Sequence, residues 1–246
     1  MAVANGAFEE RLQEIDVYLD LLGALERQVQ SGPPMLGGAV ISAQQQRILY
    51  SSVYLQLYNL VEATVTWCVE AVAASATGGS WHPRDLAAEL QREWVRSTAR
   101  THIELSSNSR LESAVAMFSS VIRSTPLSSL KVEKGGGGNW DDCSIEAIAE
   151  RLGLHLQIST EVFQGIKRKI RDDKSALVYI RDARNKLAHG GLSFGEAGDG
   201  ITVSDLVDMK ERTTAYLREV VAAFNAYIVG YGFISPERRP GIVVNS

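Results

Sequence analysis

The strongest constraint on the fold of this 246-residue chain is helical periodicity over long segments. In residues 43–76, apolar side chains such as Leu60 and Val69 recur around most of the circumference of a helix, which is typical of a helix buried on nearly all sides. We therefore predict that residues 43–76 form the central helix of the core. An amphipathic pattern predicts another helix at residues 8–29, which ends before the helix-breaking segment Ser31-Gly32-Pro33-Pro34.

Helical patterns also account for most of the remaining sequence. They lie at residues 85–105, 111–122, 144–152, 160–171, 175–189 and 204–229. Strand signals are nearly absent, and the Gly-rich residues 192–203 predict a loop or a small hairpin before the last helix. A content of 45% apolar and 22% charged residues is typical of a globular protein. We predict an all-α fold with one domain over residues 1–246, a core at about 43–230 and a tail at 231–246.

The cysteines and histidines are not spaced like metal ligands. Cys68 and Cys143 are far apart, and the four histidines form no closely spaced pair. We therefore predict no disulfide framework, no metal and no cofactor. The longest apolar stretches, residues 71–76 and 220–223, are far shorter than the roughly 18 residues of a membrane-spanning helix, and the N-terminus lacks a secretory signal. We expect a cytoplasmic protein that does not enter a membrane.

Four consecutive glycines at residues 135–138 predict a mobile loop. A phosphate-binding loop of the P-loop type would end in Gly-Lys-Ser or Gly-Lys-Thr, whereas this chain continues with Asn139-Trp140-Asp141. The glycine run therefore does not predict a nucleotide site.

Positive charge is concentrated in residues 166–186. This segment has eight basic and three acidic residues, a net charge of +5, although the whole chain has a net charge of −4 and the remainder therefore −9. Such a concentration indicates a local site for a polyanion. A run of Lys and Arg residues is also common on the solvated face of a helix, so the charge alone does not decide the function.

The same segment leads into a sequence that has the groups needed for RNA cleavage, Arg184-Asn185-Lys186-Leu187-Ala188-His189. A guanidinium group binds phosphate through paired hydrogen bonds, and an imidazole transfers protons near neutral pH. His189 could take the proton from a ribose 2′-hydroxyl while Arg184 stabilises the charge that grows on the phosphate. DNA lacks this hydroxyl, so the chemistry selects RNA. His189 followed by Gly190 is also compatible with an ordinary helix C-terminus.

At these residues the chain resembles the HEPN family (higher eukaryotes and prokaryotes nucleotide-binding domains), whose motif is Arg, a polar residue, three further residues and His. Further similarities are Tyr58-Asn59-Leu60-Val61-Glu62 on an early core helix, Asn139-Trp140 leading to residues 148–154, and Leu187-Ala188-His189-Gly190 followed by a loop and residues 201–206. The resemblance covers about residues 49–227.

The resemblance implies an α-helical bundle that forms a homodimer in which two Arg–His motifs face each other in one cleft. It implies a metal-independent endoribonuclease, often a toxin or an anti-phage defence effector, with Arg184 and His189 as catalytic residues. Asn185, Glu62 and Asn59 would support them. In some HEPN toxins, a Tyr two residues after the His is modified by an antitoxin; this chain has Gly191 there, so that mode of control is not expected.

The expected partners are an RNA substrate, a second copy of the chain and a cognate antitoxin or defence partner protein. The RNA is expected to contact basic side chains of the positive segment. These residues are Arg181, Lys186, Lys167, Arg168 and Lys169.

Three alternatives remain open from the sequence. Residues 144–170 can be interpreted as a helix-turn-helix that binds DNA, with the small residue Ala149 four positions before Gly153. The chain could instead be a HEPN domain that binds a nucleotide or a protein without catalysis. It could also be a structural helical protein in which the Arg–His spacing is accidental.

Overall fold

The computed structural model describes residues 5–29, 31–99, 104–133 and 139–240. Its helices are α1 (Asn5–Val29), α2 (Ala43–Gly78), α3 (Ala88–Thr98), α4 (Ser107–Ile122), α5 (Asp142–Arg151), α6 (Thr160–Lys167), α7 (Ala176–Ala188), α8 (Phe194–Ala197) and α9 (Val203–Val229). Short antiparallel hairpins join β1 (Met35–Leu36) to β2 (Ala39–Val40) and β3 (Lys169–Arg171) to β4 (Lys174–Ser175). The predicted all-α class is confirmed, and the glycine run at residues 135–138 lies outside the described residues.

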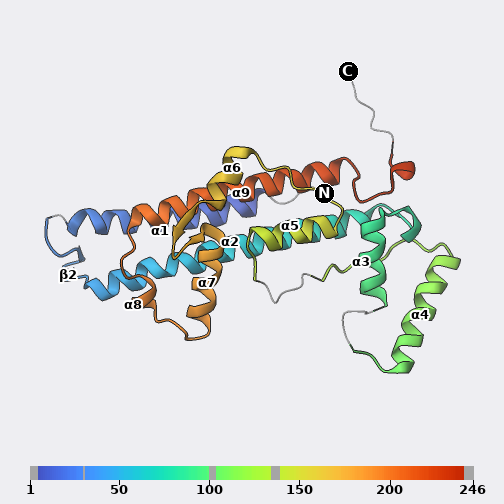
Figure 1. Ribbon diagram of the computed structural model, residues 1–246, viewed down its shortest axis with the longest axis horizontal. Coiled ribbons are helices and arrows are strands. Elements are labelled where there is room, and N and C mark those ends of the chain that lie inside the picture. The colour runs from blue at the N-terminus through green and yellow to red at the C-terminus, as the bar shows by residue number, and fades with distance from the viewer. Residues whose placement is uncertain (1–4, 30, 100–103, 134–138, 241–246) are drawn as a thin grey trace, which may run out of the picture.

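The central position predicted for residues 43–76 is confirmed, because 14 residues of α2 are buried. The helix begins at a capping box, in which the Ser42 hydroxyl accepts from the Gln45 amide and the Gln45 side chain accepts from the Ser42 amide. α2 packs against α1, α7, α8 and α9. Figure 1 shows α1, α2 and α9 running along the longest axis of the molecule, with α7 steeply inclined to them. α2 thus supports the helix that carries the Arg–His motif.

α4 stands apart from the long helices beside α3, near one end of the molecule, whereas α7 and α8 lie toward the other end (Figure 1). α3 is shorter than the predicted helix at residues 85–105, because Asp85 belongs to a separate 3-10 turn, Pro83–Asp85, and Leu86 and Ala87 are extended. α4 begins at Ser107, four residues before the predicted start, since the Ser106 hydroxyl caps it by accepting from the Ser109 amide.

The predicted helix at residues 160–171 is wrong in its last turn. α6 ends at Lys167, and the chain continues into the β3–β4 hairpin. Asp172 and Asp173 have positive φ angles of 51° and 57°, as the central residues of a type I′ turn require. Because Asp is one of the residues that tolerate this conformation, the two adjacent aspartates favour a hairpin over a continued helix.

The segment at residues 192–203 does not form the predicted loop or small hairpin throughout. It contains the short helix α8, which begins at a capping box between Ser193 and Glu196. The last helix begins at Val203, one residue before the predicted start at residue 204, because the Thr202 hydroxyl caps it by accepting from the Asp205 amide. None of the described helices is both long enough and apolar enough to cross a membrane.

Candidate functional site

α7 positions the motif by burying one of its faces. Leu177, Ile180, Ala183 and Leu187 recur at spacings of three and four and are buried in the core, while α7 packs against α2. Arg184 lies between these positions, at the boundary of the buried face, and its side chain is 21% exposed. The helix periodicity thus gives the guanidinium group one protein-facing side and one accessible side.

The Arg184 guanidinium is fixed by three neighbouring side chains. Its central carbon lies 3.8 Å from the centroid of the Tyr58 ring, a cation–π contact. One of its nitrogens donates to Asn185 Oδ1 over 2.7 Å, and another lies 3.7 Å from Glu62 Oε2. Tyr58 and Glu62 are four residues apart on α2, so they lie on the same face of that helix. The aromatic and acidic residues of the sequence resemblance therefore form the support under Arg184.

The segment Asn139-Trp140-Asp141 reinforces this cluster from the side of α5. Asn185 donates to Asn139 Oδ1 over 2.7 Å, and the Trp140 amide donates to the Tyr58 hydroxyl over 3.1 Å. Partial burial raises the pKa of Tyr58 above its ordinary value, although the Trp140 amide and Arg184 act in the opposite direction. Because the net shift is upward, the hydroxyl is neutral at pH 7 and can accept the bond. Asp141 accepts a hydrogen bond from Arg181 and also caps α5.

Arg181 and Lys174 form a second charged cluster with Asp182, next to Asp141. Arg181 donates to Asp182 Oδ1 over 2.8 Å, and Lys174 donates to Asp182 Oδ2 over 2.7 Å. Partial burial acts to raise the pKa of Asp182, but hydrogen bonds from Lys174 and Arg181 outweigh it, and the pKa is lowered. This cluster fixes the middle of α7 to the β3–β4 hairpin and to the start of α5.

His189 lies at the C-terminal end of α7 and is exposed. Its amide donates to the Asn185 carbonyl over 3.0 Å, and its imidazole has no hydrogen-bond or ion-pair partner among the described residues. Gly190 has a φ of +70°, and the Gly191 amide donates to the Lys186 carbonyl over 2.8 Å, which closes the helix. The helix end therefore presents the imidazole to solvent.

In the folded chain, several basic side chains of residues 166–186 are paired with carboxylates. Lys167 pairs with Asp142, Arg168 lies 3.3 Å from Asp208, and Lys169 lies 3.6 Å from Asp173. Asp142 and Asp208 come from α5 and α9, so they are invisible to a local charge count. Of the predicted RNA-contacting residues, Lys186 is exposed and has no ion-pair partner in the part of the chain that the structure describes. The predicted polyanion surface is thus reduced to the region around Lys186 and His189.

Asn59 does not join the cluster around Arg184. Its Oδ1 accepts a hydrogen bond from Arg11 of α1, so the side chain connects α1 to α2. Glu62 and Asn185 do contact Arg184, as predicted for supporting residues. From the sequence, no role is assigned to Tyr58, Asn139 or Asp141, although Tyr58 and Asn139-Trp140 are both parts of the resemblance.

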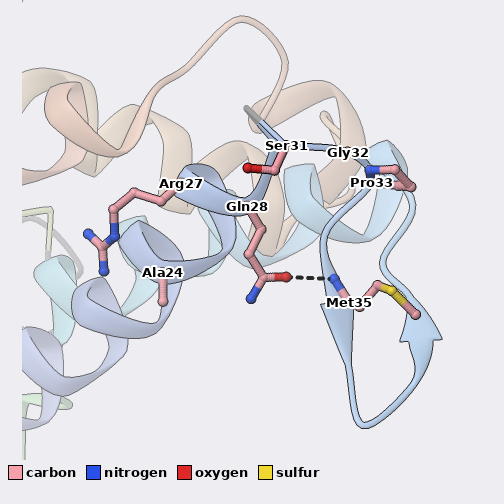
Figure 2. Close-up of a pocket in the computed structure, with 7 residues that line it drawn as sticks. All are labelled: Ala24, Arg27, Gln28, Ser31, Gly32, Pro33 and Met35. Atoms are coloured by element: carbon pink, nitrogen blue, oxygen red, sulfur yellow. Dashed lines mark hydrogen bonds between the residues drawn. The ribbon is translucent and has the colours of Figure 1, made fainter.

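The hollow at the C-terminal end of α1 offers no comparable set of groups. Figure 2 shows Arg27 and Gln28 beside Ser31, with Gln28 Oε1 accepting from the Met35 amide over 2.8 Å. This bond anchors the turn between α1 and β1. Among the described residues, no group of three or more His, Cys, Asp or Glu side chains is placed to share a metal ion.

α5 and α6 do not form a helix-turn-helix. α5 ends at Arg151 and α6 begins at Thr160, so residues 152–159 separate them, whereas the motif needs a turn of about 3–4 residues. Leu152 and Leu154 of this connection are buried in the core, and the Ser159 amide donates to Glu219 on α9 over 2.7 Å. The DNA-binding alternative for residues 144–170 therefore has no structural support.

The structure is an all-α bundle in which the motif from Arg184 to His189 lies at the end of α7 and Arg184 packs on Tyr58 and Glu62 of the central helix. This is the arrangement that the sequence resemblance to the HEPN family implies. A family model for MAE_28990-like HEPN domains matches residues 5–233. The chain is therefore a member of the HEPN family. No curated protein and no solved structure matches it.

Proposed function

We propose that this chain is a metal-independent endoribonuclease. The observation that carries the proposal is the contrast between two side chains of one helix. Arg184 is held against Tyr58 and Glu62, while His189 is exposed and has no side-chain partner among the described residues. A fixed cation and an accessible imidazole are the two groups that cleavage of RNA by its own 2′-hydroxyl needs.

In the proposed reaction, His189 removes the proton of a ribose 2′-hydroxyl, and the 2′-oxygen forms a bond to the adjacent phosphorus. The bond from phosphorus to the 5′-oxygen breaks, and this oxygen takes up a proton. The products are a 2′,3′-cyclic phosphate and a 5′-hydroxyl. Arg184 donates to the phosphate oxygens whose charge grows in the transition state. Its contact with the half-exposed Glu62, at 3.7 Å, is weak enough to be exchanged for a phosphate.

The proposed cleft is shared by two protomers. Residues five apart on an α-helix point in directions that differ by about 140°, so a single α7 directs Arg184 and His189 to different sides. A two-fold dimer in which the α7 ends approach each other combines Arg184 of one protomer with His189 of the other. Lys186, which is exposed and beside this end, is the basic residue best placed to contact RNA. We further propose that the enzyme acts in the cytoplasm as a toxin or defence effector under the control of a partner protein.

The test is cleavage of a mixed RNA pool in excess chelator by the wild type, Arg184→Ala and His189→Ala. We expect fragments with 2′,3′-cyclic phosphate ends, and rate losses of about 10²–10³-fold for Arg184→Ala and about 10²–10⁴-fold for His189→Ala. The exposed residues His155 and Arg92 provide matched controls, because His155→Ala and Arg92→Ala remove the same chemical groups outside the α7 end.

Equal cleavage by the wild type and both site variants would mean that another site or a contaminant acts, and would reject the proposal. RNA binding without cleavage by any protein would favour the non-catalytic HEPN alternative. For the toxin role, growth arrest on expression should be relieved by His189→Ala; harmless expression of an active wild-type enzyme would contradict it.

A further inference from the structure

α4 exposes apolar side chains that a helix normally buries. None of its described residues is buried, and Leu111, Val115, Phe118 and Ile122 are 65%, 56%, 67% and 65% exposed. Their spacing of four, three and four residues places them on one stripe, which is the pattern of a helix–helix seam. We call these four residues the α4 stripe. Figure 1 shows that α4 stands away from the long helices, with α3 as its neighbour.

One side of α4 borders α3. Ala114, Val115, Met117, Phe118 and Val121 line an apolar hollow together with Trp94 and Val95 of α3. Val115 and Phe118 thus belong both to the α4 stripe and to the lining of this hollow, so the stripe and the hollow form one continuous exposed apolar surface. Residues 113–122 contain no charged side chain, and Ala114 and Ser119 beside the stripe are small, so another helix can approach closely.

We infer that the α4 stripe pairs with the α4 stripe of a second copy of this chain, with the two helices antiparallel. The spacing of the stripe is the same when it is read backwards. In an antiparallel pair, Leu111 therefore lies opposite Ile122 of the partner subunit, and Val115 lies opposite Phe118 of the partner subunit, as positions a and d require in a coiled coil.

Charge also favours this arrangement over a parallel one. Glu112 lies beside the stripe at its N-terminal end, and Arg123 caps the C-terminal end of the helix. Antiparallel pairing brings Glu112 of each copy to the end that carries Arg123 of the partner subunit, whereas parallel pairing places like charges together. Antiparallel helix dipoles also attract each other. This pairing is independent of the proposed ribonuclease activity, because α4 lies far from α7 in the molecule (Figure 1).

The test uses two variants of the full chain, Val115→Glu and Phe118→Lys, whose sites are exposed, so that folding is retained. Sedimentation equilibrium over a wide concentration range should show that each variant alone loses up to about half of the wild-type average mass, because one two-fold interface is lost. An equimolar mixture of the two variants should regain the wild-type mass, since the introduced carboxylate and ammonium lie opposite each other only in an antiparallel pair. Ala116→Glu, on the side of α4 away from the stripe, should keep the wild-type mass.

Equal masses for the wild type, Val115→Glu and Ala116→Glu would overturn the inference and leave the α4 stripe to a different protein. Loss of mass without recovery in the mixture would reject the antiparallel register. Circular dichroism spectra equal to that of the wild type exclude misfolding as the cause of a lower mass. Because these outcomes concern mass alone, they do not depend on whether the protein cleaves RNA.

Discussion

At the scale of single residues, Tyr58 has two separate roles beside Arg184. Its ring lies under the Arg184 guanidinium, and its hydroxyl accepts a hydrogen bond from the buried amide of Trp140. The first role needs only an aromatic ring, whereas the second needs the oxygen atom. The two roles can therefore be separated by one substitution.

We expect Tyr58→Phe to lower the free energy of unfolding by about 1–3 kcal/mol, because the Trp140 amide loses its acceptor in a buried place. RNA cleavage should be largely retained, since the ring under Arg184 remains. Tyr216→Phe on α9 is the matched control: the Tyr216 hydroxyl is also buried but has no hydrogen-bond partner among the described residues, so its removal should leave stability unchanged or increased. Urea unfolding measures both effects, and equal losses for the two variants would contradict the assigned role of the Tyr58 hydroxyl.

Asp182 makes part of the stability depend on pH. Its pKa is lowered in the folded protein, so its contribution to stability is fully present above the unfolded value of about 3.9 and is lost as the pH falls through the lower folded value. Asp182→Asn should therefore be less stable than the wild type at pH 7, and the difference should shrink as the pH falls below about 3.9. Asp173→Asn, at a side chain that is 91% exposed, should differ little from the wild type at either pH. Urea unfolding at several pH values checks this, and a difference for Asp182→Asn that is independent of pH would contradict it.

At the scale of elements, the sequence predicts helices from apolar side chains that recur with helical spacing. It does not predict the contacts between segments that are distant in the chain. The periodicity of residues 43–76 was sufficient to predict a central helix, and Arg184 and His189 could be proposed as a pair from local order alone. The pairing of Lys167 with Asp142 and of Arg168 with Asp208 could not be predicted, because it joins residues of different helices. For the same reason Asn59, adjacent to Tyr58 in sequence, was assigned to the site although it faces α1.

The short helix α8 illustrates a contact that only the packed structure reveals. A Cβ atom at Gly198 would lie 2.0 Å from the Arg47 carbonyl oxygen of α2, so Gly198→Ala must move α8 away from α2. We expect a loss of about 1–3 kcal/mol in the free energy of unfolding. Gly195→Ala, within α8, meets no atom within 4 Å and should be neutral or gain up to about 1 kcal/mol from helix propensity. Thermal or urea unfolding compares them, and a neutral Gly198→Ala would show that α8 does not pack closely on α2.

At the scale of the whole molecule, the two proposed surfaces for self-association, on α7 and on α4, are separate. The proposed cleft would join two copies through the α7 ends, and the α4 stripe would join two copies near the other end of the molecule (Figure 1). A chain with two different two-fold interfaces assembles either into a closed tetramer or into an open array. Breaking the α4 pair with Val115→Glu should thus leave the α7 dimer, and its cleavage of RNA, intact.

The proposed sharing of one cleft by two protomers has a consequence that a site within one chain would lack. Arg184→Ala retains His189, and His189→Ala retains Arg184, so a mixed dimer contains one complete Arg–His pair and one pair without either group. If subunits exchange freely, half of the dimers are mixed and each has one competent pair of two, so an equimolar mixture of the two inactive variants should regain about a quarter of the wild-type rate. Cleavage of a labelled RNA after co-incubation, with each variant alone as the control, measures this recovery. No recovery after verified subunit exchange would place both groups of each functional pair in the same protomer, since an intact pair would then never form in the mixture.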